Sequence, residues 1–145
     1  MSLATQFAAH HRLLDQLWDD TQTRVAAADW PGAGAAFGAF RAAIERHMRT
    51  EEQILFPAYE EVHGADNPLT SILRKGHKDL RSFFDEIGEA VETADGDEAA
   101  ALIGTTGQIL LHHDAKEEEE LYPAVDRLLP QAAADKAARQ LEPPN

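Results

Sequence analysis

The 145-residue chain contains no cysteine. This absence excludes disulfide bonds, thiolate zinc sites and cysteine-ligated iron–sulfur clusters. It does not by itself identify the cellular compartment. Any metal ion that the protein binds must therefore be held by nitrogen and oxygen atoms.

Basic residues are also scarce, because 13 lysines and arginines stand against 26 aspartates and glutamates, for a formal net charge of −13. Such a charge repels nucleic-acid phosphates and anionic lipid headgroups, and no basic patch offsets it. Uninterrupted apolar runs fall far short of a membrane span. The first residues, MSLATQFAAHH, contain neither a basic segment nor a sustained apolar one. We therefore expect a cytoplasmic protein whose partners include neither nucleic acids nor membranes.

Apolar residues recur at spacings of three and four along an alanine-rich chain, which predicts helices and no competing strand. Glycine, proline and Asx residues mark breaks at 28–32, 63–68, 94–97 and 128–130. The predicted helices span residues 3–28, 32–62, 68–94 and 97–129, with a brief tail helix within 131–145. Short connections make neighbouring helices antiparallel, so we expect an all-α, up-down-up-down four-helix bundle with a short C-terminal tail helix. The chain length suits one domain, residues 1–145.

Two prolines, Pro57 and Pro123, lie inside the second and fourth predicted helices. A proline in a helix interior removes a backbone hydrogen bond and costs about 3 kcal/mol. We expect kinks at these residues rather than helix ends.

A segment of the second helix returns in the fourth helix. HMRTEEQILFP at 47–57 and HDAKEEEELYP at 113–123 share a histidine, a glutamate four residues later and a Leu-aromatic-Pro ending, at an offset of 66 residues. At the same offset, HRLLDQLW at 11–18 in the first helix corresponds to HKDLRSFF at 77–84 in the third. Each half of the chain is therefore one helical hairpin that carries a histidine and then an HxxxE motif.

The histidines of each hairpin are expected at the same height. Residues equidistant from the turn of an antiparallel hairpin are level, and the midpoints of the two histidine pairs fall in predicted turns, at Asp29 and Asp95. The pairs are His11 with His47 and His77 with His113. Glu51 and His77 have their midpoint at Gly64, in the second turn, so the two hairpins meet at one level.

The HxxxE motifs point into the predicted core. Side chains at i and i+4 share a helix face, and the same face of the second helix carries Phe40, Ile44 and Leu55. Buried carboxylates without a counter-charge are strongly unfavourable, and two bridged cations with histidines in the outer positions would resolve the conflict. Nitrogen and oxygen ligands suit iron or manganese and tolerate zinc. The candidate metal ligands are His11, His47, Glu51, His77, His113 and Glu117.

A metal-free structural bundle is the alternative interpretation. A single HxxxE motif on a helix is common by chance, and a lone buried histidine is more often hydrogen-bonded than bound to metal. Two motifs in equivalent phase, each with a level partner histidine, favour the metal site.

The order H, HxxxEExxLFP, H, HxxxEExxLYP resembles the hemerythrin-like family, also called the hemerythrin HHE cation-binding domain. The resemblance covers roughly residues 7–128. It implies two non-haem iron ions, bridged by two carboxylates and an oxo or hydroxo group, with the six residues named above as ligands. It also implies a protein that binds or senses oxygen, nitric oxide or peroxide at an open iron position.

One position departs from the oxygen-carrying members of that family. They have a fifth histidine one turn before the third-helix ligand, where this chain has Leu73, and the equivalent position in the first helix is Phe7. Both irons would then keep a position for an exogenous molecule. Asp15, one turn after His11, is a candidate substitute ligand, although a surface or capping role is favoured. The departure weakens oxygen carriage and favours reactions with peroxide, nitric oxide or oxygen.

Two other functions remain open: a di-iron enzyme with catalase-like or ferroxidase activity, and a protein for iron storage or delivery.

Other histidines and acids are expected outside the site, namely His10, His112, the Glu60/His63 pair, and a solvated acidic face of Glu52 and Glu118 to Glu120. One member of this face is expected to form a hydrogen bond outside the site. Core positions are expected for Trp18, Phe56, Phe84 and Tyr122, and Trp18 and Phe84 are also candidates for walls of the open metal position.

Overall fold

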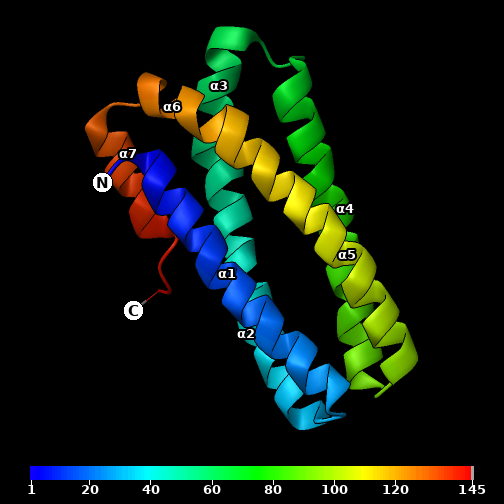
Figure 1. Ribbon diagram of the computed structural model, residues 1–145. Helices are drawn as coiled ribbons and strands as arrows, with labels where there is room; N and C mark the ends of the chain where they lie inside the picture. The colour runs from blue at the N-terminus through cyan, green and yellow to red at the C-terminus, as the bar shows by residue number, and fades with distance from the viewer. Residues whose placement is uncertain (145) are drawn as a thin grey trace.

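The computed structural model describes residues 1–144, and all of the regular structure in that range is helical. The prediction of an all-α fold is therefore confirmed for these residues. Asn145, the last residue of the predicted tail, lies outside the described residues. Within residues 1–144, four long helical segments pack lengthwise against one another (Figure 1).

The helical elements follow one another closely along the chain. In order they are α1 (Leu3–Ala26), α2 (Trp30–Thr50), the π-helical turn η1 (Glu51–Leu55), α3 (Phe56–His63), α4 (Pro68–Glu92), α5 (Gly96–Lys116), the π-helical turn η2 (Glu117–Leu121), α6 (Tyr122–Leu128) and α7 (Gln131–Gln140). One continuous segment contains α2, η1 and α3, and another contains α5, η2 and α6. The predicted helix boundaries agree closely with these, and α7 is the predicted tail helix.

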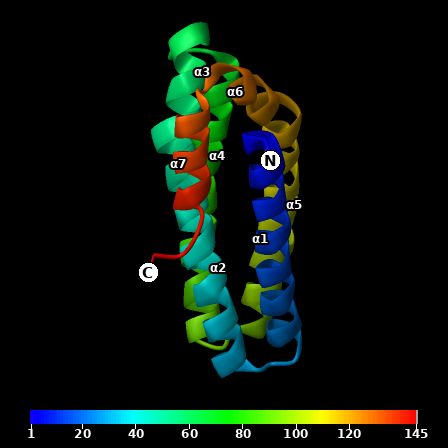
Figure 2. The same cartoon turned by 90° about the vertical axis from the view of Figure 1, so that its left-hand side faces the viewer.

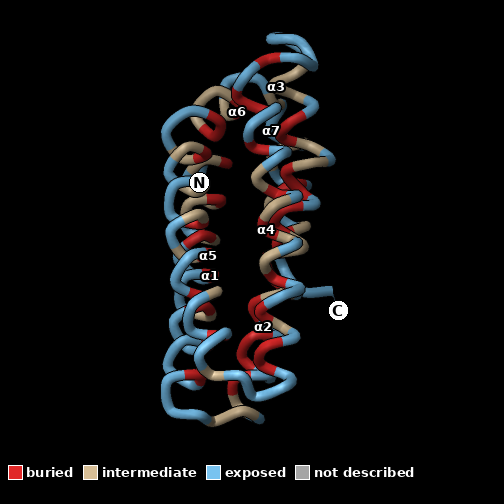
Figure 3. Tube along the Cα trace, turned by 90° about the vertical axis from the view of Figure 1, so that its right-hand side faces the viewer, coloured by how far each residue is buried: buried red, intermediate tan, exposed pale blue. Residues whose placement is uncertain are grey.

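The long segments enclose one interior. α1 packs against α2 and α5, and α4 packs against the same two helices. α7 lies against α1 and α2, and in Figure 2 it is seen in front of α2. Buried positions recur on the sides of the helices that face the interior (Figure 3), which is the packing of a helical bundle. Across residues 1–144, every helix is too short or too polar to span a lipid bilayer.

Two apolar clusters fill the interior. The larger contains Trp18 and Phe84, and the smaller contains Phe7 and Phe56, so the predicted core positions of Trp18, Phe84 and Phe56 are confirmed. Along α1, buried His11 lies one turn after Phe7 of the smaller cluster and about two turns before Trp18 of the larger. A polar layer therefore crosses the core between two apolar clusters.

The two hairpin turns have the same structure. Ala28 and Ala94 adopt φ angles of 54° and 55°, in the left-handed region. In each turn the next amide, that of Asp29 or Asp95, donates to the carbonyl five residues earlier at 2.9 Å, as in a Schellman motif. The side chains of the same aspartates accept hydrogen bonds from amides three residues later, at 3.1 Å and 3.2 Å. One aspartate thus closes one helix and begins the next. Each turn is therefore short, and residues equidistant from it lie at the same height on the two helices.

Both prolines inside the long segments follow a π turn. The amide just before Pro57 or Pro123, that of Phe56 or Tyr122, donates to the carbonyl five residues earlier instead of four. The wider turn removes the clash between a proline ring and the carbonyl four residues before it. The prediction that the helices continue past both prolines is confirmed, and the local distortion is a π turn.

Replacing Ala28 or Ala94 by glycine is expected to stabilise the protein. A residue with a β-carbon in the left-handed region costs roughly 1–2 kcal/mol, which exceeds the extra flexibility of glycine in the unfolded chain. The free energy of unfolding, measured by urea denaturation, should rise by about 0.5–1 kcal/mol for each substitution. The control is Ala101→Gly, at an exposed position inside α5, which should lose about 1 kcal/mol. Losses at the two turns would contradict the expectation.

Candidate metal centre

The six candidate ligands come together in the interior from all four long segments. They form two groups of four residues, and within each group one ligand atom per residue lies within 4.8 Å of the others. The first site contains His11, His47, Glu51 and Glu117. The second site contains His77, His113, Glu51 and Glu117. All six side chains are at most 9% exposed, so the two sites form one buried cluster.

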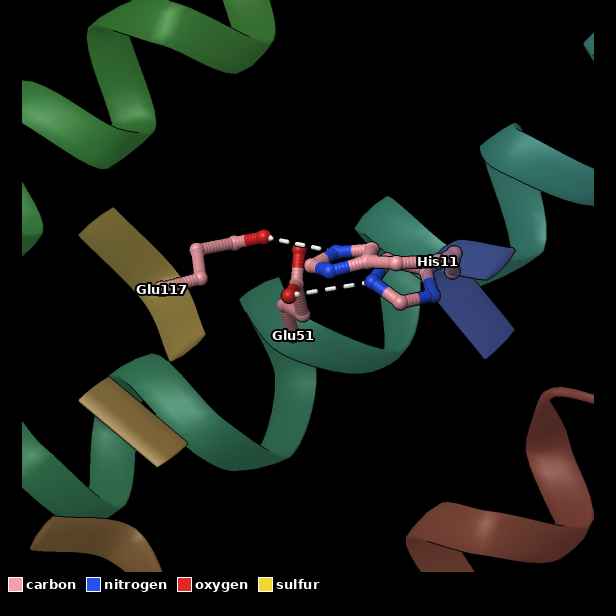
Figure 4. A group of neighbouring side chains, drawn as sticks. His11, Glu51 and Glu117 are labelled. Carbon is pink, nitrogen blue, oxygen red and sulfur yellow. Dashed lines mark hydrogen bonds and ion pairs between the residues drawn. The ribbon is translucent and has the colours of Figure 1, made fainter. Parts of the chain in front are cut away.

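The two glutamates belong to both sites because each divides its oxygens between them. Glu51 places Oε2 at 3.2 Å from His47 Nε2 and Oε1 at 3.1 Å from His77 Nε2. Glu117 places one oxygen at 3.2 Å and the other at 3.3 Å from a histidine of each site. Figure 4 shows the side chains of His11, Glu51 and Glu117 directed toward one another from three different segments. This is the arrangement that two bridging carboxylates require.

Two further carboxylates orient the histidines on α1 and α4. His11 Nδ1 lies 2.7 Å from Glu118 and His77 Nδ1 lies 2.7 Å from Glu52. Each carboxylate also accepts a hydrogen bond from an arginine, at 2.6 Å and 2.8 Å. A carboxylate that holds Nδ1 fixes the ring and presents Nε2 to a metal ion. The prediction of a solvated face is wrong for Glu52 and Glu118, which are only 25% and 26% exposed.

The other two candidate histidines are oriented by different neighbours. His47 Nδ1 lies 2.8 Å from Nδ1 of half-buried His10, and their rings stack. Burial and the charge of His47 lower the pKa of His10 to about 3, so His10 is neutral and shares one hydrogen bond with His47. His113 packs over Gly76, where an added β-carbon would lie 2.7 Å from His113 Nδ1. Only glycine leaves room for this ring.

Protons balance the buried carboxylates in the metal-free protein. Burial lowers the pKa of His11, but its hydrogen bond with Glu117 and the charge of Asp114 raise it to about 10. The pKa of His77 and of His113 is also raised by neighbouring carboxylates, against the effect of burial. Burial alone would raise the pKa of Glu117, but the charge of His113 and the hydrogen bond with His11 hold it well below its usual range. The cluster therefore attracts positive charge strongly.

Four buried atoms of the second site lack a hydrogen-bond partner among the described residues. They are Glu51 Oε1, His77 Nε2, His113 Nε2 and Glu117 Oε2. Neighbouring pairs lie 3.1 Å to 3.3 Å apart but are not aligned for hydrogen bonds. Buried polar atoms left unpaired are costly, and one cation held by two imidazole nitrogens and two carboxylate oxygens would satisfy all four. The donor set thus fits a metal ion.

The space inside the cluster is small. A cavity of about 10 Å³ lies among the six candidate ligands, close to the volume needed for one water molecule. A groove of about 490 Å³ on the surface of α1, α2 and α5 shares part of its lining with that cavity. The shared residues are Leu14, Ile44, Leu110 and Asp114. The groove therefore leads toward the cluster, whose inner space is too small for an organic substrate.

The hydroxyl of Tyr122 lies within the first site. It donates to Glu51 Oε2 at 2.5 Å and lies 3.1 Å from Glu117 Oε1, His11 Nε2 and His47 Nε2. The predicted core position of Tyr122 is confirmed, but its place in the site was missed. On an α-helix a residue five positions after Glu117 points about 140° away from it, and the π turn brings the two side chains to one face. The signal available in the sequence was Pro123, because a proline inside a helix marks a local departure from α geometry.

The remaining candidates lie outside the cluster. Asp15 is 57% exposed and pairs with Arg12 at 3.4 Å, so it has the favoured surface role rather than that of a substitute ligand. His112 and His63 are exposed, as predicted. Glu60 pairs with an arginine at 2.8 Å, and the Glu60/His63 spacing therefore does not contribute to this cluster.

Removing either orienting carboxylate is expected to weaken metal binding. Glu52→Ala or Glu118→Ala frees a histidine ring that must be held in one orientation, and such losses cost about 10–100-fold in metal affinity. Glu119→Ala is the matched control, because it removes the same charge from an exposed position of η2. Competition with a chelator of known affinity measures the three variants. Equal affinities for all three would show that the orienting contacts are unimportant.

Comparison with known families agrees with the geometry. The sequence model of the hemerythrin HHE cation binding domain matches residues 2–125. Comparison with curated proteins and with solved structures gave no match. The matched region contains all six candidate ligands and both π turns. The resemblance noted from the motifs is thus confirmed, and the chain belongs to the hemerythrin HHE cation-binding domain family.

Proposed function

We propose that this chain is an up-down-up-down four-helix bundle that holds two iron ions, one in each site, and binds or senses a small molecule there. Glu51 and Glu117 would bridge the ions together with an oxo or hydroxo group. The observation that carries the proposal is the set of four unpaired polar atoms in the second site. Family membership supports a cation at this position.

The ligand set favours iron or manganese over softer metals. Four imidazoles and two carboxylates combine intermediate and hard donors, which suits iron and manganese, and the chain has no thiolate to select a softer ion. Bound iron supplies the electrons and open coordination positions with which oxygen, nitric oxide or peroxide can react. Of these two metals we propose iron, because the motifs resemble those of di-iron hemerythrins.

The residues around the cluster select the small molecule by size and polarity. Leu14, Ile44 and Leu110 line both the surface groove and the inner cavity, so a molecule moving between them passes apolar side chains. The six candidate ligands are at most 9% exposed, which keeps bulk water away from them. An uncharged molecule of two or a few atoms is therefore the occupant that fits best. Deep burial of the metal ligands also disfavours the rapid exchange that iron storage or delivery requires.

One observation favours the enzymatic alternative, a catalase-like or ferroxidase activity. Asp114 is the acidic side chain common to the described linings of the groove and the cavity, burial raises its pKa to about 7, and its Oδ1 lies 3.3 Å from His11 Nε2. A carboxyl group that titrates near neutral pH beside the cluster can give or take a proton, which is what turnover requires. Turnover is therefore the second candidate function.

Replacing His113 by leucine is expected to remove bound metal, because the second site loses one of its two nitrogen ligands. His112→Leu is the control, since His112 is the neighbouring residue and is exposed. Iron per chain, measured by elemental analysis after purification and after reconstitution, should fall for His113→Leu and stay unchanged for His112→Leu. A His113→Leu protein with full iron content and higher stability would instead support a metal-free structural bundle.

Mixing the iron-loaded, reduced protein with hydrogen peroxide is expected to distinguish binding from catalysis. A binding or sensing protein should give one spectral change per site and no oxygen release. Stopped-flow absorbance and an oxygen electrode provide the two measurements. Sustained oxygen release over many equivalents of peroxide would identify the catalase-like alternative and contradict a role limited to binding.

A further inference from the structure

The first site contains a donor that the second site lacks. Four polar atoms from four residues surround the Tyr122 hydroxyl at 2.5 Å to 3.1 Å. A phenol donates one hydrogen bond and accepts two, so it cannot satisfy all four neighbours at once. The hydroxyl therefore has more polar neighbours than it can pair with by hydrogen bonds.

The equivalent position of the second site has no hydroxyl. Phe56 stands in the other half of the chain at the same 66-residue offset from Tyr122, directly before a proline and directly after a π turn. Its ring packs against His77 with centroids 5.2 Å apart. Both side chains are fully buried, so the two halves of the repeat differ at this point by one oxygen atom.

The ligand atoms without a hydrogen-bond partner lie in the site that lacks the hydroxyl. All four unpaired ligand atoms among the described residues face the second site, beside Phe56. The corresponding atoms of the first site have the Tyr122 oxygen as a neighbour. His11 Nε2 and Glu117 Oε1 also pair with each other at 3.2 Å, whereas His47 Nε2 and Glu51 Oε2 depend on the Tyr122 oxygen, which is therefore a main cause of the asymmetry between the two groups of ligands.

Packing holds the Tyr122 ring in place. It meets Phe7 edge-on, with centroids 5.4 Å apart, and belongs to the same apolar cluster as Leu73. The backbone of Tyr122 is tied to Glu117 by the π-turn hydrogen bond. The hydrogen-bonding neighbours of the Tyr122 hydroxyl all belong to the first site. A cation that enters this site therefore lies directly against the hydroxyl.

We propose that the oxygen of Tyr122 is a ligand of the metal ion in the first site, so that the second ion alone keeps an open position for an exogenous molecule. The inference rests on the proposed di-iron function and deepens it. Tyr122 would bind as phenolate, because the metal ion displaces the phenolic proton and that proton passes to solvent. It would give the first ion the additional protein ligand that a histidine at Phe7, one turn before His11, would have supplied, whereas the fifth-histidine position itself, Leu73, lies one turn before His77 of the second site.

The test is the absorption spectrum of the iron-loaded, air-oxidised protein. Phenolate bound to ferric iron absorbs in the visible region and gives tyrosine ring modes in the resonance Raman spectrum, whereas imidazole and carboxylate ligands do not. We expect this band in the natural protein and its loss in Tyr122→Phe. Tyr59→Phe removes the chain's other tyrosine, which stacks on His63 away from the cluster, and should keep the band.

A converse variant tests the asymmetry. Phe56→Tyr places a hydroxyl at the equivalent position beside the second site, and we expect it to strengthen the visible band. Tyr122→Phe should also release one of its two irons to a chelator faster than the natural protein does, a readout that is independent of colour. Its folding is checked by circular dichroism, and Phe56 shows that phenylalanine is accommodated at the equivalent buried position.

The outcomes separate this inference from the proposed function. Two irons per chain with no phenolate band in the natural protein, or with a band unchanged by Tyr122→Phe, would overturn the role of Tyr122 and leave the di-iron site intact. A chain that binds no transition metal would overturn the proposed function itself. Two irons, a phenolate band and its loss in Tyr122→Phe alone would support both.

Discussion

Two carboxylates buried among apolar side chains require positive charge beside them, and the organisation of this molecule follows from that requirement. Glu51 and Glu117 are at most 1% exposed, and their oxygens face four histidines rather than water. In the metal-free protein, raised histidine pKa values supply the charge as protons. A metal ion would supply it more completely, because it also pairs the atoms that hydrogen bonds leave unsatisfied.

The duplicated hairpin explains how the cluster is assembled. Asp29 and Asp95 each close one helix and cap the next, so both hairpins have equally short turns and bring their histidines level. Glu52 and Glu118, also 66 residues apart, hold equivalent histidines. The duplication is imperfect at several places beside the cluster, and at one of them one half has a phenol where the other has only a phenyl ring.

The π turns connect this backbone geometry to chemistry. Each begins at a bridging glutamate and ends just before an aromatic residue and a proline. The extra residue in the turn both accommodates the proline and rotates the aromatic side chain onto the face of the glutamate. A helix of uniform α geometry would direct Tyr122 away from Glu117 and remove its hydroxyl from the first site.

The sequence by itself determined the all-α fold, the helix boundaries and the six candidate ligands. Periodicity, turn residues and the spacing of His and Glu are local signals, and helix geometry translates them directly into faces and heights. Tertiary structure alone decided the roles of Glu52, Glu118 and Tyr122. Those roles depend on which helices become neighbours and on a local departure from the α-helical repeat, and neither can be read from one segment taken alone.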